Sequence, residues 1–172
     1  MDMFFTAKRK TFEEFMEIYD RAQLNAQVDS PLIFNAMANH DPESRFKIVN
    51  FLISEGVDLT VLNSENECLF HILFSRPNHN IEQSTILIKK LLEANVNINQ
   101  FDKKKRLPIQ HIINSGLNED EISEWYDIIF AQENLILTEK NAWGYSPIEL
   151  TQKSFPMCQK LLERMNAYIQ NK

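Results

Sequence analysis

Glycine, cysteine and long apolar runs are scarce in this chain. Only 3 of its 172 residues are glycine and only 2 are cysteine. Three scattered glycines cannot form a phosphate-binding loop. Cys68 and Cys158 lie far apart and have no CxxC spacing, which argues against a disulfide framework and a cysteine-rich zinc site. No stretch approaches the ~20 apolar residues of a membrane helix. We therefore expect a cytoplasmic protein with no membrane contact, no cofactor and no bound metal.

Positive charge is also in the minority. The 18 Lys and Arg residues are outnumbered by 24 Asp and Glu residues, and the formal net charge is −6. A nucleic-acid-binding protein needs a basic field against phosphate, so this balance disfavours that class. The one concentrated basic run is Lys103–Arg106. The length suits one domain or one short repeat array, with enough residues to bury a substantial core.

What the chain does contain is an internal repeat with a period of 39 residues. Three columns of residues keep this interval across three copies, and they are Gly56, Asn95 and Asn134; Asn63, Asp102 and Asn141; and Leu69, Pro108 and Pro147. A fourth copy upstream, around Pro31, is one residue shorter, and the deficit falls in or near a polar connector. Three columns with one period indicate a repeat architecture.

Each copy is expected to form two helices. Proline suits the first turn of a helix, so four prolines are expected to start helices, namely Pro31, Pro108, Pro147 and Pro156. The second helix of a copy is expected to end at Gly56 or its equivalents Asn95 and Asn134. Glycine and asparagine tolerate the left-handed conformation that closes a helix.

These segments resemble ankyrin repeats. "GYSPIEL" is similar to the helix start of that family, "GVDLT" and "NVNIN" are similar to its exit, and "CLFHIL" keeps its histidine as His71. The resemblance covers roughly residues 28 to 170. It departs from the family in its longer period and in Ile33, Gln110 and Glu149, which replace the histidine. It implies an all-α, ankyrin-like solenoid of helix-turn-helix repeats with short finger turns and helical caps at both ends.

The expected boundaries follow from the columns. Residues 1–27 are expected to form an N-terminal helical cap, or a degenerate extra half-repeat, in which Thr11 and Glu14 match a capping box. Residues 28–172 form the repeat array. Its approximate repeats are 28–65, 66–104, 105–143 and 144–172.

The histidines and cysteines of the chain are expected to have structural rather than catalytic roles. His71 occupies the repeat position at which the family's histidine makes local hydrogen bonds, whereas His111 comes one position after its own copy's equivalent and is expected to face the groove. Cys68 is expected to pack as a small side chain, and no base is expected beside either cysteine. We therefore expect no catalytic residue and no enzymatic activity.

The resemblance implies a protein-protein interaction module that binds one protein partner through its finger tips and concave helix face. The expected partner-binding residues are Lys103, Lys104, Lys105, Arg106, His111, Trp143 and Tyr145. The basic run can instead be a solvated turn, and the two rings can instead pack on the neighbouring finger. We expect a monomer. By analogy of size and type, an immunity protein that neutralises a toxin is one candidate role. A self-associating array and an unrecognised hydrolase are the alternatives.

Overall fold

The computed structural model describes residues 2–172, and all regular secondary structure in this range is helical. The protein is therefore all-α, as expected. Its α-helices are α1 (Met3–Arg9), α2 (Phe12–Ile18), α3 (Leu32–Met37), α4 (Pro42–Ser54), α5 (Leu69–Phe74), α6 (Ile81–Glu93), α7 (Pro108–Ile113), α8 (Ser123–Phe130), α9 (Pro147–Lys153) and α10 (Gln159–Gln170), and one 3-10 helix covers Arg21–Gln23.

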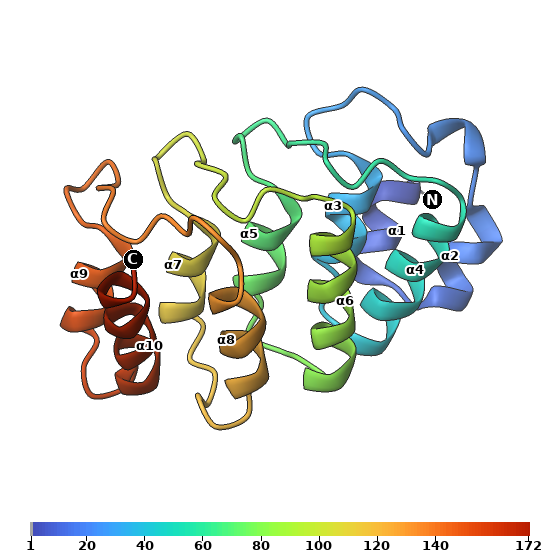
Figure 1. Cartoon of the computed structure of the whole chain (residues 1–172). Coiled ribbons are helices and arrows are strands. Elements are labelled where there is room, and N and C mark those ends of the chain that lie inside the picture. Colours follow the sequence, from blue (N-terminus) through green and yellow to red (C-terminus); the bar gives the residue numbers. More distant parts are fainter. Residues whose placement is uncertain (1) are drawn as a thin grey trace.

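The helices form two parallel rows (Figure 1). The odd-numbered helices α1, α3, α5, α7 and α9 pack successively against one another, and so do the even-numbered helices α2, α4, α6, α8 and α10. Long loops project from the same side of the assembly. Segment 1–27 contains α1 and α2, which extend both rows by one helix each.

The core lies between and along the two rows. Its fully buried side chains come from almost every helix, and the largest include Phe15, Leu32, Ile48, Phe70, Leu73 and Trp125. Trp125 and Tyr126 on α8 are both buried, with 0% and 2% of their surfaces exposed. None of the described helices combines the length and the apolar character needed to cross a membrane.

Most of the expected helix boundaries are confirmed. Thr11 and Glu14 form the capping box of α2. Gly56 has φ +88°, and Asn95 and Asn134 have φ +59°, so all three adopt the left-handed conformation. Gly56 and Asn95 come two residues after the ends of α4 and α6, whereas Asn134 comes four residues after α8 ends at Phe130. Gly56 and Asn95 close their helices in the same way, since the Val57 and Val96 N–H groups donate to the Leu52 and Leu91 carbonyls at 3.1 and 3.0 Å. The expectation that Asn134 ends its helix was wrong, because α8 is already capped at Ala131. All three positions still need a left-handed residue, which favours glycine and asparagine.

The prolines are confirmed in part. Pro108 and Pro147 are the first residues of α7 and α9, and Pro31 is the N-cap of α3. The expectation for Pro156 was wrong, because α10 begins three residues later, at Gln159. Residues 154–158 form turns instead, in which the Met157 N–H donates to the Ser154 carbonyl (2.9 Å).

Candidate functional site

Three projecting turns, at residues 63–67, 102–106 and 141–145, are built alike, and we call them fingers 1, 2 and 3. In each finger the side-chain Oδ1 of the first residue accepts hydrogen bonds from the backbone N–H groups two and four positions later. The distances are 3.0 and 3.0 Å at Asn63, 2.8 and 2.8 Å at Asp102, and 3.0 and 3.2 Å at Asn141. A short Asn or Asp side chain is required for this local bond, which explains the repeated column.

The fourth residue of each finger has a positive φ. The angles are +62° at Asn66, +55° at Lys105 and +82° at Gly144. Asparagine and glycine tolerate this conformation, but for lysine it costs about 1 kcal/mol. Finger 2 therefore keeps a lysine at its tip despite local backbone strain.

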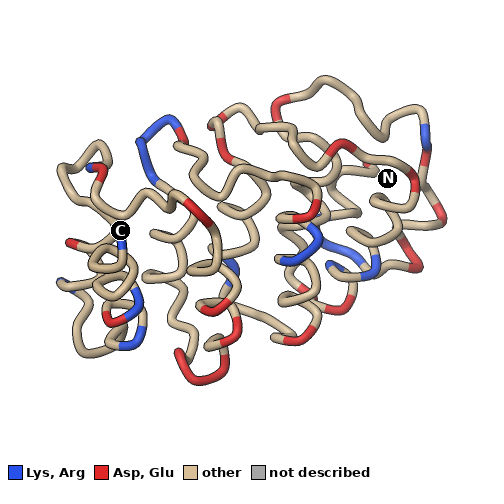
Figure 2. Tube along the Cα trace, in the orientation of Figure 1, with Lys and Arg blue, Asp and Glu red and all other residues tan. Residues whose placement is uncertain are grey.

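The fingers are joined by backbone hydrogen bonds. The Lys103 N–H donates to the Glu65 carbonyl, and the Ala142 N–H donates to the Lys104 carbonyl, each at 2.9 Å. Figure 2 shows the result, with the basic residues of finger 2 between finger 1, which carries acidic residues, and finger 3, whose tip is uncharged. The three tips thus form one continuous surface.

Side-chain ion pairs also form between fingers 1 and 2 and within finger 2. Lys103 lies 3.9 Å from Glu65, and Arg106 lies 3.7 Å from Glu67 and 2.6 Å from Asp102. Such ion pairs near the surface contribute little to stability. The ion pairs with Glu65 and Glu67 instead hold the side chains of finger 2 next to finger 1.

Most of the expected partner-binding residues lie on this surface. Lys103, Lys104 and Lys105 are exposed, and Arg106 is half-buried. Trp143 is 58% exposed, and the Lys104 ammonium lies 5.8 Å from the centre of its ring.

The two aromatic rings of finger 3 differ in their exposure to solvent. Trp143 leaves more than half of its surface in solvent, whereas Tyr145 is half-buried. The ammonium of Lys153, the last residue of α9, lies 3.7 Å above the Tyr145 ring. Both rings therefore carry a lysine on one face, an arrangement that favours the cation electrostatically.

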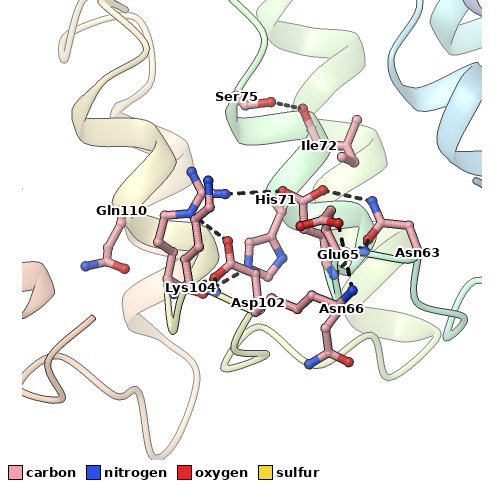
Figure 3. Close-up of polar contacts among 12 residues, drawn as sticks. Asn63, Glu65, Asn66, His71, Ile72, Ser75, Asp102, Lys104 and Gln110 are labelled. Carbon is pink, nitrogen blue, oxygen red and sulfur yellow. Dashed lines mark hydrogen bonds and ion pairs between the residues drawn. The ribbon is translucent and has the colours of Figure 1, made fainter. Parts of the chain in front are cut away.

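His71, Asp102 and His111 form the one polar cluster in the described residues with metal-ligand geometry, since three of their ligand atoms lie within 4.8 Å of one another. His71 uses both ring nitrogens for other contacts. Its Nδ1 accepts from the Cys68 N–H (3.1 Å), so its Nε2 carries the proton and donates to the Arg106 carbonyl (3.1 Å). No lone pair of His71 is left for a metal. The cluster instead links α5 to finger 2 (Figure 3).

Cys68 corrects one expectation. The sequence indicated no base beside it, yet its Sγ lies 3.3 Å from Nδ1 of His71. The pair is the N-cap and third residue of α5, a spacing that brings side chains together in any capping box. Burial raises the pKa of the Cys68 thiol to about 11 and lowers the pKa of His71. Both groups are therefore neutral near pH 7, and only 2% of Cys68 is exposed.

A pocket of about 370 Å³ opens between α7, α9 and finger 3. It brings together four of the expected site residues, Arg106, His111, Trp143 and Tyr145. His111 is half-buried, with its ring at 77° to the His71 ring and 5.5 Å away. Burial, reinforced by His71 and Arg106, lowers the pKa of His111 to about 4. The imidazole is thus neutral near pH 7.

Sequence reasoning missed the other residues that line the pocket, which are Gln110, Asn114, Asn141 and Leu150. One signal was available for Gln110, because it occupies the same repeat position as His71 and Glu149. The pocket itself depends on how finger 3 lies over α7, which the pattern of columns does not contain.

No family model matches the chain, and no curated protein matches it. The chain is similar to the crystal structure of a functionally unknown protein from Leptotrichia buccalis C-1013-b, with 28% sequence identity and a TM-score of 0.85. The similarity covers 98% of this chain and 93% of that protein. The two chains therefore share their helix arrangement over nearly their whole lengths.

Proposed function

We propose that this chain is a non-enzymatic protein-protein interaction module, built as an ankyrin-like helical repeat, that binds a protein partner through its finger tips and concave helix face. The repeated finger supports the ankyrin-like part of the proposal. The same side-chain hydrogen bonds and the same positive φ recur at intervals of 39 residues, from Asn63 to Asp102 to Asn141.

The observation that carries the binding role is the exposed Trp143 beside the basic tip of finger 2. Tryptophan is the residue type most enriched among the residues that dominate binding energy in interfaces, and its exposure in a free protein is unfavourable. The neighbouring Lys103, Lys104 and Lys105 add positive charge to a protein with a net charge of −6. A local field of this kind steers an acidic partner surface to the site.

Lys105 supports the same role. Its positive φ of +55° is at the position that Asn66 and Gly144 occupy without comparable strain. Backbone strain persists mainly where a side chain has a function that a better-suited residue cannot perform. A lysine in this conformation is a reason to assign the charge to binding rather than to a solvated turn.

The non-enzymatic part rests on how the reactive groups are used. The thiol of Cys68 is buried and protonated, and His71 is neutral with both nitrogens hydrogen-bonded. His79 is similarly occupied, since its Nε2 lies 2.9 Å from the Arg76 carbonyl and its Nδ1 lies 2.8 Å from the Ser84 Oγ. These groups are arranged to hold backbone and side chains in place.

The double substitution Trp143→Ala and Tyr145→Ala tests the proposal. We expect it to weaken binding of the partner by at least ~10-fold, because two aromatic anchors are removed. The melting temperature should fall by no more than a few degrees, since Trp143 is largely exposed. Binding is measured by calorimetry with a partner purified by affinity from the native cell, and stability by thermal unfolding.

Phe155→Ala is a matched control. Phe155 is also 58% exposed but lies between α9 and α10, away from the finger tips. We expect it to leave binding unchanged. If the double variant lost its stability while each folded molecule still bound the partner normally, the two rings would be scaffold. Sedimentation of the wild-type chain alone separates this module from a self-associating array.

A further inference from the structure

One repeat position recurs with a constant role. His71, Gln110 and Glu149 are each the third residue of a short helix, and each accepts a hydrogen bond from the backbone N–H of the helix N-cap residue. The acceptors are Nδ1 of His71 (3.1 Å), Oε1 of Gln110 (2.8 Å) and Oε2 of Glu149 (2.8 Å). Three chemically different side chains thus fix the start of α5, α7 and α9.

His71 and Gln110 differ in the hydrogen bonding of their second polar side-chain atom. Nε2 of His71 reaches forward to the Arg106 carbonyl at the end of finger 2, at 3.1 Å. The equivalent bond from Gln110 would end on the carbonyl of Tyr145, which follows Arg106 by one period. That bond is not made. Nε2 of Gln110 is buried without any hydrogen-bond partner, and only 3% of the residue is exposed.

The direction of the Gln110 amide is set by its surroundings. The Leu107 N–H needs an acceptor and takes Oε1, so the unpaired group must be the NH₂ donor. An unpaired buried donor costs about 1–3 kcal/mol. No group of the neighbouring cluster of His71, Asp102 and His111 bonds to this donor.

The site at which Gln110 lacks this hydrogen bond is the pocket between α7, α9 and finger 3, which we call the Gln110 pocket. The bridge from His71 connects α5 directly to finger 2, whereas no such bond connects Gln110 to finger 3. Gln110 lies in the wall of the pocket, and so does His111, whose Nε2 is also buried without a partner. The wall therefore contains one unpaired donor and one neutral imidazole with a free nitrogen.

The rim of the pocket is positively charged. The Lys104 and Lys153 ammonium groups lie over the rings of Trp143 and Tyr145. Neither lysine is among the residues that form ion pairs within residues 2–172, and both can approach an incoming anion. A hydrogen bond from a buried amide to a carboxylate is stronger than one to a neutral acceptor.

We propose that the Gln110 pocket binds a side-chain carboxylate, from an aspartate or glutamate of the protein partner, with Nε2 of Gln110 as its hydrogen-bond donor. This inference rests on the proposed protein-binding function and names the chemistry of one contact within it. The acid enters between the Trp143 and Tyr145 rings, and the two lysines offset its charge.

The test follows the side-chain amide signal of Gln110 in NMR spectra of the whole chain. The probes are N-acetyl-glutamate N-methylamide, its glutamine analogue, and N-acetyl-alanine, whose carboxylate is terminal. We expect the glutamate probe to shift the Gln110 signal saturably, with a dissociation constant of order 1 mM for so small a ligand. The glutamine analogue and N-acetyl-alanine should bind at least several-fold more weakly.

Two variants separate the contact from the fold. Gln110→Glu keeps the capping acceptor, as Glu149 does in its own helix, but replaces the donor with a negative oxygen. It should fold and lose at least ~10-fold in affinity for the glutamate probe. Gln110→His should complete the bridge to finger 3, raise the melting temperature and also lose the probe. In the variants, the backbone amide signals of finger 3 report binding.

The outcomes are distinct. No shift with the glutamate probe, unchanged binding in Gln110→Glu, or tighter binding of N-acetyl-alanine would each overturn the carboxylate pocket. None of these results bears on whether the fingers bind a protein, because no partner is used. Conversely, if the Trp143→Ala and Tyr145→Ala double variant kept full affinity for the partner, the proposed function would fail even with a working pocket.

Discussion

Acidification from pH 7 to about 4.5 is expected to destabilise the folded chain by several kcal/mol, largely before its carboxylates are protonated. Burial lowers the pKa of His79 and of His111 to about 4, with Arg45 contributing at His79 and His71 at His111. The unfolded chain has ordinary histidines with a pKa near 6.5. Between pH 6.5 and 4 the unfolded state therefore binds more protons, so stability is fully present above this window and is lost as the pH falls through it.

The size of the expected loss of stability follows from the pKa shifts of the two histidines. A difference of one pKa unit corresponds to about 1.4 kcal/mol, so each of these histidines contributes at most about 3.5 kcal/mol. Burial also lowers the pKa of His71, which adds in the same direction. The pKa of Asp102 is lowered by its hydrogen bonds to Arg106 despite burial, so the stability it contributes is lost at still lower pH.

Urea unfolding at a series of pH values measures this dependence. The variant with His79→Gln and His111→Gln lacks both titrating groups, and its stability should change much less between pH 7 and 4.5. His79 packs edge-on against Trp125 at 5.0 Å and lies near Arg45 and Arg76, so no carboxylate compensates its charge. Equal pH slopes for the wild type and the double variant would show that these histidines are not the cause.

Trp125→Ala is expected to lower the free energy of unfolding by about 3–5 kcal/mol, the usual range for removing a large buried aromatic side chain. Trp125 is fully buried on α8, and its Nε1 donates to Thr85 Oγ1 on α6 at 2.9 Å. Its ring lies 6.0 Å from that of Phe74 on α5. The substitution therefore leaves a cavity where both rows of helices meet, and the Thr85 hydroxyl loses a donor while it keeps its own bond to the Ile81 carbonyl at 2.7 Å.

The second tryptophan is the control. Trp143 is 58% exposed, so Trp143→Ala should change the free energy of unfolding by no more than ~0.5 kcal/mol. Guanidinium unfolding followed by circular dichroism measures both variants. A stability of Trp125→Ala within ~1 kcal/mol of the wild type, or an equal loss in Trp143→Ala, would contradict the packing described here.

The sequence predicted features that depend on local hydrogen bonds. The column of Asn63, Asp102 and Asn141 exists because a short polar side chain closes each finger, and the column of Gly56, Asn95 and Asn134 exists because the backbone is left-handed at each of these positions. Local rules of this kind leave a visible signal in the residue type and its spacing.

Features that depend on tertiary packing were missed. Arg45 lies in what reads as the polar start of α4, yet it is 1% exposed because its guanidinium donates to the carbonyls of Asn39 and Asn78. Residues 1–27 were expected to be helical, but not to contain α1 as a helix separate from α2, and α1 packs against α3 without a strong local pattern of its own. The unpaired amide of Gln110 is likewise visible only when finger 3 is placed over α7.

Site-specific photo-crosslinking in the native cell tests whether the finger surface contacts a protein partner. A benzophenone amino acid replaces either Trp143 or the equally exposed Phe155. We expect one dominant protein adduct from position 143 and none of that mass from position 155. An adduct formed equally from both positions, or from position 155 alone, would contradict this expectation.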